Sequence, residues 1–266
     1  MQNLNKFPKI HKAKKSLGQN FLKSVPALNK IIEVGEIKNS DTILEIGPGK
    51  GALTAKLLEN AGLVIAIEKD RDLLETLREK FAEEIKTKRF MLIEGDALEF
   101  EPSENGLKSG GYKVIANIPY NITGAILKKF LAGHTQPERM VLMVQKEVAE
   151  RVVARDGKES ILSISVRVYG DPKLVMKVPA RYFSPAPKVD SAIISISGIS
   201  RGTFQENNIS EEVFWEIVKT GFAHKRKMLS GNLKNIVSTE KITKLGLENS
   251  RAENLKLEDW INLAKQ

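Results

Sequence analysis

The sequence predicts an α/β protein with a doubly wound, mostly parallel sheet of seven strands, followed by a small all-helical domain. Three observations predict this fold. Apolar runs typical of strands alternate with amphipathic stretches typical of helices, two later β-rich runs are joined by a proline-containing loop, and helical patterns continue from there to the C-terminus. A chain of 266 residues is long enough to bury such a core.

The alternating segments predict βαβ units, which place their strands in parallel. We expect strands at residues 42–46, 63–67, 90–94, 113–116 and 139–145, and helices at residues 53–60, 71–81, 122–131 and 146–154. In such a sheet the carboxyl ends of the strands share one edge, where open α/β sheets bind their ligands.

The segments after Tyr169 have a different character. Residues 173–178 and 191–196 are β-rich and predict an antiparallel hairpin at the sheet edge, where proline is tolerated. A polar stretch at 198–208 then leads into helical patterns at 211–220, 225–236 and 257–264. We therefore expect a first domain at residues 1–200 and a helical second domain at residues 201–266.

The charge of the chain is concentrated at its N-terminus. The chain carries 42 Lys and Arg against 33 Asp and Glu, a formal charge of +9, and its pI of about 9.5 favours a polyanionic partner. Residues 1–32 contain no acid and seven lysines: Lys6, Lys9, Lys12, Lys14, Lys15, Lys23 and Lys30. This concentration indicates an arm that contacts phosphates, and a solvated tail is the alternative for residues 1–10.

Several classes of protein are disfavoured by composition. Without cysteine the chain has neither disulfides nor thiolate metal sites, and His11, His134 and His224 lack ligand spacing. No apolar run approaches the roughly 18 residues of a membrane span, and no apolar stretch follows the basic N-terminus. We expect a metal-free cytoplasmic protein.

A glycine-rich turn follows the first predicted strand and opens a helix. It reads Glu45-Ile46-Gly47-Pro48-Gly49-Lys50-Gly51, with glycines at alternating positions, whereas a dinucleotide fingerprint requires G-x-G-x-x-G. The carboxylate of Glu45 would repel a phosphate and suits a ligand with an ammonium group. An ordinary βα turn is the alternative. The pattern E-x-G-x-G-x-G resembles motif I of S-adenosylmethionine-dependent methyltransferases.

Acidic residues follow the next two strands. Glu68 lies 23 residues after Glu45, near the spacing at which nucleotide-binding α/β folds place a carboxylate on ribose hydroxyls. Asp96 follows the third strand and could accept a hydrogen from an adenine amino group. The alternatives are a surface Glu68 within a charged run and an Asp96 that caps a helix. Together with Gly47, the two acids predict an adenosyl pocket.

The fourth strand ends in Asn117-Ile118-Pro119-Tyr120. An aryl amine is a poor nucleophile because its lone pair is delocalised into the ring. The Asn117 side-chain oxygen and a backbone carbonyl held by Ile118-Pro119 could bind both amine hydrogens and direct the lone pair at a methyl group, while Tyr120 offers a flat face for stacking. No strong base is required, since proximity and alignment carry most of the acceleration. A plain β-turn is the alternative.

At this point the chain resembles the ribosomal RNA adenine N6,N6-dimethyltransferase family, in its small-subunit branch, over nearly its whole length. The residues that carry the resemblance, beyond the motifs above, are His11-Lys12-Ala13-Lys14-Lys15-Ser16-Leu17-Gly18-Gln19-Asn20-Phe21-Leu22, Phe183-Ser184-Pro185-Ala186-Pro187-Lys188-Val189-Asp190-Ser191 and Phe222-Ala223-His224-Lys225-Arg226-Lys227-Met228-Leu229. The fold implied is that of Rossmann-like class I S-adenosylmethionine methyltransferases. One departure is His224-Lys225-Arg226-Lys227, where family members commonly have Gln-Arg-Arg-Lys, so individual RNA contacts there are in doubt.

The resemblance implies roles for individual residues. S-adenosyl-L-methionine would be the cofactor, contacted by Asn20, Leu22, Gly47, Glu68, Asp96 and Asn117. The catalytic residues implied are Asn117, Pro119, Tyr120 and Phe183, with Phe183 stacking the flipped adenine opposite Tyr120.

The function implied is dimethylation of two adjacent adenosines in the 3′-terminal hairpin loop of small-subunit (16S) rRNA. The expected substrate is an immature 30S-type particle, and the protein is expected to be a monomer. Alternatives are a large-subunit rRNA adenine dimethyltransferase that confers antibiotic resistance, a non-catalytic nucleic-acid-binding assembly or transcription factor, and an NAD-dependent oxidoreductase, which the glycine spacing disfavours.

Overall fold

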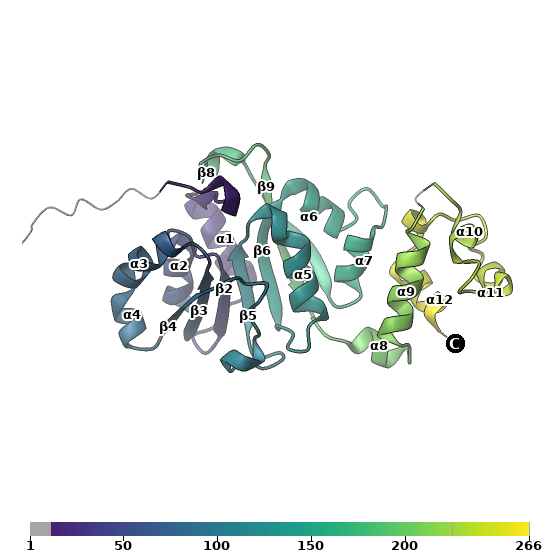
Figure 1. Cartoon of the computed structure of the whole chain (residues 1–266), viewed down its shortest axis with the longest axis horizontal. Helices are drawn as coiled ribbons and strands as arrows, with labels where there is room; N and C mark the ends of the chain where they lie inside the picture. The colour runs from purple at the N-terminus through teal and green to yellow at the C-terminus, as the bar shows by residue number, and fades with distance from the viewer. Residues whose placement is uncertain (1–11, 225, 266) are drawn as a thin grey trace, which may run out of the picture.

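A mixed sheet forms the centre of this computed structural model, which describes residues 12–224 and 226–265 (Figure 1). In spatial order the seven strands of the sheet within these residues are β4 (Phe90–Glu94), β3 (Leu63–Glu68), β2 (Thr42–Ile46), β5 (Lys113–Asn117), β6 (Arg139–Gln145), β9 (Ser191–Ser197) and β7 (Asp171–Val178). The predicted α/β sheet of seven mostly parallel strands is confirmed.

Strand directions match the predicted hairpin. The strands β4, β3, β2, β5 and β6 run parallel, whereas β9 lies antiparallel between β6 and β7. The edge strand β7 contains Pro172 and a register irregularity between Leu174 and Met176. Both features are tolerated at an edge, because proline there removes no hydrogen bond that an inner strand needs.

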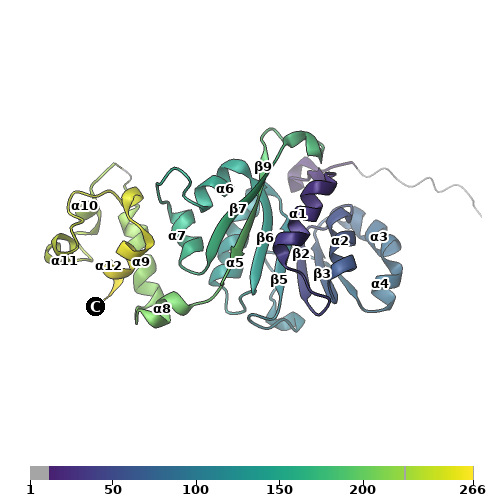
Figure 2. The same ribbon diagram turned by 180° about the vertical axis from the view of Figure 1, so that it is seen from behind.

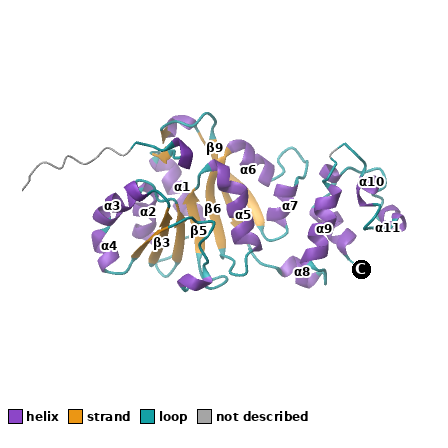
Figure 3. Ribbon diagram, viewed as in Figure 1, coloured by secondary structure: helices purple, strands orange, loops and turns teal. Residues whose placement is uncertain are grey.

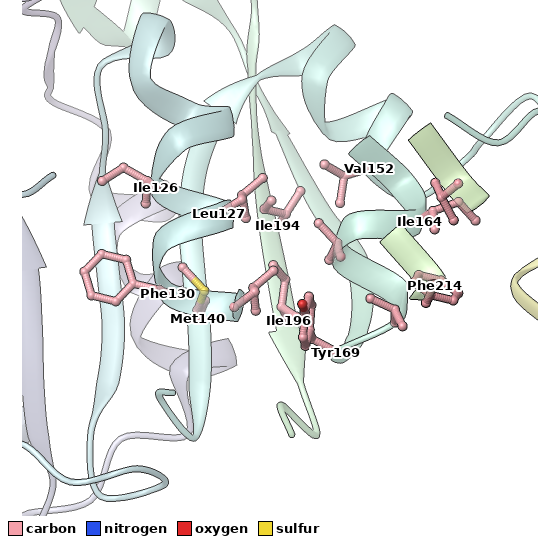
Figure 4. Close-up of a cluster of buried hydrophobic side chains, with 14 of the residues drawn as sticks. Ile126, Leu127, Phe130, Met140, Val152, Ile164, Tyr169, Ile194, Ile196 and Phe214 are labelled. Carbon is pink, nitrogen blue, oxygen red and sulfur yellow. The ribbon is translucent and has the colours of Figure 1, made fainter. Parts of the chain in front are cut away.

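Helices cover both faces of the sheet. One face carries α1 (Val25–Gly35), α2 (Ala52–Asn60), α3 (Arg71–Lys80) and α4 (Ala82–Lys86), and the other carries α5 (Thr123–Ala132), α6 (Lys146–Val152) and α7 (Ile161–Arg167) (Figures 1 and 2). The strands supply both cores by alternation. In β2, for example, Ile43 packs with the first group and Leu44 with the second. Figure 4 shows the second core, where α5, β6 and β9 meet.

The C-terminal part is helical, as predicted. After β9 the described chain forms only helices, 3-10 turns and loops (Figure 3). Its α-helices are α8 (Gly202–Glu206), α9 (Glu211–Gly221), α10 (Leu229–Leu233), α11 (Thr239–Lys244) and α12 (Leu257–Ala264). The α12 residue Trp260 is fully buried and stacks on Phe222, with ring centroids 5.3 Å apart. One apolar cluster continues from the sheet into these helices, so the division at residue 200 stays a prediction.

The sequence prediction missed several helices and made one too long. Helix α1 was not predicted, although Ser24 caps it and Pro26 lies in its first turn. The helices α7 and α11 were missed too, and α8 lies within the polar stretch at 198–208, where no helix was expected. The helix expected at 225–236 is shorter: in the described chain it begins after the extended Met228 and ends at Leu233. Gly231 and Asn232 lower helix propensity in this segment.

A short antiparallel pair brings the N-terminal segment beside the loop that follows β7. It is formed by β1 (Phe21–Leu22) and β8 (Phe183–Ser184), and Lys23 N–H donates to the Tyr182 carbonyl at 2.8 Å. The segment before α1 is therefore fixed against the α/β core. No helix within the described ranges combines the length and the apolar character needed to cross a bilayer.

Candidate active site

A cavity of about 550 Å³ lies where the parallel strands end. The segment before α1 lines one side of it, and the loops after β2, β3, β4 and β5 line the rest. The predicted site residues that line it are Asn20, Leu22, Gly47, Glu68, Asp96, Asn117, Pro119 and Tyr120. Residues that are up to 100 positions apart in the sequence thus meet at one edge of the sheet, as the βαβ pattern predicts.

All three glycines of the turn after β2 adopt left-handed backbone conformations, with φ of 67° at Gly47, 59° at Gly49 and 72° at Gly51. The surroundings differ. A Cβ on Gly47 would meet no protein atom within 4 Å, whereas a Cβ on Gly49 would lie 2.9 Å from the Phe21 ring and one on Gly51 would lie 2.6 Å from the Phe81 ring. Gly47 therefore leaves room for a ligand beside the backbone, while Gly49 and Gly51 are required by internal packing.

Glu68 ends β3 and is almost fully buried at the cavity. Its Oε2 accepts from the Gly49 N–H at 3.0 Å and its Oε1 accepts from the Asp70 N–H at 2.8 Å. Burial raises the pKa of Glu68, and the two backbone donors partly offset this rise. Each carboxylate oxygen has a further lone pair, so the bound orientation still allows Glu68 to accept from a diol.

Asp96 is held by two partners beyond the end of β4. Its Oδ1 accepts from the Leu98 N–H at 2.9 Å, and its Oδ2 forms an ion pair of 2.7 Å with Lys69, whose side chain is exposed. The Lys69 hydrogen bond and then the Leu98 N–H lower the pKa of Asp96, so the carboxylate is charged at neutral pH. Lys69 was not singled out from the sequence, and an adenine amino group would share Asp96 with it.

Glu45 is 1% exposed, and its Oε2 has no hydrogen-bond partner in the described structure. Burial, together with the nearby charge of Glu68, raises the pKa of Glu45 from 4.5 to about 8. Glu45 also lines the cavity. A buried carboxyl with one unpaired oxygen is costly at this place unless a cationic ligand or a proton satisfies it.

Replacing Glu45 with glutamine is expected to change how stability depends on pH. Because the folded pKa is about 8 and the unfolded pKa is 4.5, the wild-type fold loses stability as pH rises through this window. The Glu45→Gln variant lacks this loss, so its advantage over the wild type should grow by at least about 1 kcal/mol between pH 5 and pH 8.5. Urea unfolding at both pH values measures it, and a pH-independent difference would contradict the assignment.

Asn117 is the last residue of β5, and its amide contacts the N-terminal segment. Its Nδ2 donates to the Asn20 carbonyl at 3.0 Å, while the Asn20 side chain donates to the Gly18 carbonyl at 3.1 Å. With Nδ2 engaged in this way, Oδ1 is the atom of the Asn117 amide that remains to accept from a substrate amine. No short-range sequence pattern indicates the contact between Asn117 and Asn20, because 97 positions separate them.

Of the two aromatic residues expected to hold the adenine, only Tyr120 lines the cavity. Tyr120 lines the cavity, and its hydroxyl shares a 2.6 Å hydrogen bond with Ser191, a residue without a predicted role. Phe183 does not line the cavity: it is 3% exposed and packs in the apolar cluster that contains Leu22 and Val178, and its neighbour Ser184 reaches the cavity instead. This conformation does not offer Phe183 for stacking, because the β1–β8 pairing directs it inward.

The side chains lining the cavity fit a cationic adenosyl ligand. Three carboxylates, those of Glu45, Glu68 and Asp96, line it. In their charged forms these three acids would repel a dinucleotide pyrophosphate, and a ligand that carries sulfonium and ammonium groups next to a ribose diol would favour those charged forms. The NAD-dependent alternative is therefore disfavoured by the charge of the site as well as by glycine spacing. Within the described ranges, no cluster of three or more His, Cys, Asp or Glu could hold a metal ion.

At least one lysine of the predicted basic arm forms ion pairs within the protein. Lys6, Lys9 and His11 lie outside the described residues, as does Lys225 of the C-terminal basic motif. Lys14 forms ion pairs with Asp70 at 2.5 Å and Asp72 at 2.7 Å. The charge of the first 32 residues is thus partly neutralised by acids of the core, which the count of lysines could not reveal.

The sheet order and the cavity at its carboxyl edge define a class I S-adenosylmethionine-dependent methyltransferase fold. Two solved structures share it over most of their length. A dimethyladenosine transferase from Plasmodium falciparum is 28% identical, with a TM-score of 0.79 over 91% of this chain and 95% of that one. The 23S rRNA methyltransferase ErmE is 25% identical, with a TM-score of 0.76 over 92% and 98% of the two chains.

The family follows from the sequence comparison. The family model described as "Ribosomal RNA adenine dimethylase" matches residues 10–266, and the chain belongs to this family. Two curated relatives carry the name "Ribosomal RNA small subunit methyltransferase A". The protein from Dehalococcoides mccartyi is 44% identical over 95% of this chain and 87% of its own, and the one from Fusobacterium nucleatum is 41% identical over 96% and 97%. The resemblance predicted from the motifs is confirmed, and with it an rRNA adenine dimethyltransferase as the kind of enzyme.

Proposed function

We propose that this protein uses S-adenosyl-L-methionine to dimethylate N6 of two adjacent adenosines in the 3′-terminal hairpin loop of small-subunit rRNA. The substrate would be an immature small-subunit particle in the cytoplasm, and the protein would act as a monomer. Two relatives that are 41% and 44% identical are named for the small subunit, whereas the 23S rRNA methyltransferase is 25% identical. These identities favour the small-subunit branch over the large-subunit alternative.

The observation that carries the proposal is the orientation of the Asn117 amide. Its Nδ2 is held by the Asn20 carbonyl, so Oδ1 is the acceptor for a substrate amine. The cavity beside it has carboxylates for a ribose and for an adenine amino group, which is the arrangement expected for an adenosyl ligand. The non-catalytic alternative predicts the loss of such a residue, and none is lost.

The residues present can align the amine. Bound S-adenosyl-L-methionine would supply a methyl group on a positively charged sulfur. Asn117 Oδ1 and a backbone carbonyl at Ile118-Pro119 would accept the two amine hydrogens and direct the nitrogen lone pair to that methyl group. The amine nitrogen would bond to the methyl group as the bond from methyl to sulfur breaks with its electron pair left on sulfur, and the methylated amine would then release one proton to water. No general base is needed.

Tyr120 would support the ring of the target base. Its hydroxyl is fixed by Ser191, which limits rotation of the phenol ring at the cavity. An enzyme that modifies a base must take it out of the stack, and an unpaired loop lowers this cost. The stacking role proposed for Phe183 would require the β1–β8 pairing to rearrange.

Methyl incorporation into matched ribosomal particles tests the proposal. Purified protein with methyl-labelled cofactor is expected to label small subunits from cells that lack the modification, approaching about four methyl groups per particle. Large subunits and already dimethylated small subunits serve as controls and should stay unlabelled. Preferential labelling of large subunits would support the antibiotic-resistance alternative, and absence of labelling in every particle would contradict the proposal.

A further inference from the structure

Asp70 lies two residues after Glu68, outside the cavity lining, and holds the segment that lines one side of the cavity. Its side chain is 0% exposed. Oδ1 accepts from Lys14 Nζ at 2.5 Å and Oδ2 accepts from Gln19 Nε2 at 2.6 Å. Hydrogen bonds from Lys14 and Gln19 hold the pKa of Asp70 below its usual value against the opposing effect of burial, so both contacts are made by a charged carboxylate.

The segment is also closed on itself. The Lys14 N–H donates to Gln19 Oε1 at 2.8 Å, and the residues between them contain the 3-10 turn Lys15–Leu17 and the left-handed Gly18. Gln19 therefore joins the backbone at Lys14 to the carboxylate of Asp70. Residues 16–23 line the cavity, so fixing this loop fixes one wall of the site.

The contacts continue from Gln19 to Asn117, the residue proposed to align the substrate amine. Asn20 follows Gln19, and its carbonyl accepts from Asn117 Nδ2. On the other side, the Asp70 N–H donates to Glu68 Oε1. Asp70 thus connects the acid expected at the ribose with the segment that orients the Asn117 amide.

We propose that Asp70 is a positioning residue, which fixes the loop of residues 14–20 over the cofactor cavity and thereby sets the orientation of the Asn117 amide. The role of Asn117 rests on the proposed function, whereas the fixing of the loop does not. Misplacement of a reacting group by about 1 Å can cost a factor of about 100 in rate, so loss of this anchor should be visible in turnover.

The chain offers variants that separate this role from folding. Asp70 caps α3 by accepting from the Asp72 N–H, and asparagine is an equally good cap. In Asp70→Asn one oxygen becomes an NH₂ group, which cannot accept from Gln19 or Lys14. The matched control is Asp72→Asn, because Asp72 pairs with the same Lys14 but is 65% exposed.

Two measurements test the proposal. Hydrogen exchange at residues 14–22, without cofactor or RNA, should be at least about tenfold faster in Asp70→Asn than in the wild type, with Asp72→Asn within about threefold. Methyl transfer at saturating cofactor should fall about 10- to 100-fold in Asp70→Asn and less than twofold in Asp72→Asn, with unchanged melting temperatures.

Combining Asp70→Asn with a substitution of Gln19 shows whether Asp70 affects methyl transfer through the loop of residues 14–20. In a Gln19→Leu background, Asp70→Asn should lower transfer by no more than about threefold further, because the contact between Asp70 and Gln19, the residue next to Asn20, is already lost. The proposal is overturned if the double variant loses the product of the two single-variant factors. It is also overturned if Asp70→Asn transfers methyl groups as fast as Asp72→Asn. If the wild type methylates no rRNA, the proposed function fails, and the exchange measurement alone decides whether Asp70 fixes the loop.

Discussion

Asn117→Ala is expected to lower the rate of methyl transfer about 10²- to 10³-fold, which is the loss typical when one preorganised polar group is removed from an active site. Alanine removes Oδ1, the proposed acceptor for the substrate amine, and the contact between Nδ2 and the Asn20 carbonyl. The affinity for S-adenosylhomocysteine, measured by calorimetry, should fall less than about tenfold, because Glu68, Asp96 and Glu45 remain at the cavity.

Two further variants make this result interpretable. Asn117→Asp keeps an acceptor but loses the donor to Asn20, so it should retain cofactor binding and lose transfer through misorientation. Asn105→Ala is the control, since the half-buried Asn105 side chain donates to the Glu101 carbonyl in a turn that does not line the cavity. Transfer by Asn117→Ala within tenfold of the Asn105→Ala rate would contradict the amine-aligning role.

Gly51→Ala is expected to destabilise the fold by about 3 kcal/mol and to abolish cofactor binding at ordinary concentrations. A left-handed residue with a Cβ costs about 1–2 kcal/mol, and overpacking against a buried ring adds about 1–3 kcal/mol. The new Cβ would lie 2.6 Å from Phe81 and 3.1 Å from Leu77, so the turn after β2 must shift away from α3. Urea unfolding gives the first quantity and cofactor titration the second.

Gly124→Ala is the matched control for this change. Gly124 lies in the first turn of α5, and a Cβ there would meet no atom within 4 Å. Alanine should leave stability unchanged or raise it by about 0.4–1 kcal/mol, because it restricts the unfolded chain. Equal stabilities of Gly51→Ala and Gly124→Ala would show that the turn adapts, and would remove the packing reason given for Gly51.

The parallel part of the fold could be predicted because its signals are local. Strands β2, β3, β4 and β6 read as apolar runs bounded by charged or turn residues, and their predicted limits agree with the structure within one residue. Because parallel strands end at one edge of the sheet, Gly47, Glu68, Asp96 and Asn117 were expected together there, and all four line the cavity. Periodicity and topology were sufficient for this much of the site.

The surroundings of Phe183, Lys14 and Asp70 could not be predicted, because they depend on contacts between residues far apart in the sequence. Phe183 was expected at the substrate, but the β1–β8 pairing buries it, and no short-range pattern encodes a pairing between residues 21–22 and 183–184. Lys14 was counted with a basic arm, although Asp70 and Asp72 neutralise it. Asp70 was not singled out from the sequence, because its burial depends on a segment more than fifty positions away.

Mass spectrometry of the modified rRNA tests the central claim most directly. After reaction of the wild-type protein with immature small subunits, digestion of the 3′-terminal hairpin should yield N6,N6-dimethyladenosine at two adjacent loop positions. The Asn117→Ala reaction should leave both adenosines unmodified. Unmodified adenosines after the wild-type reaction, or methyl groups on any atom other than N6, would contradict the account.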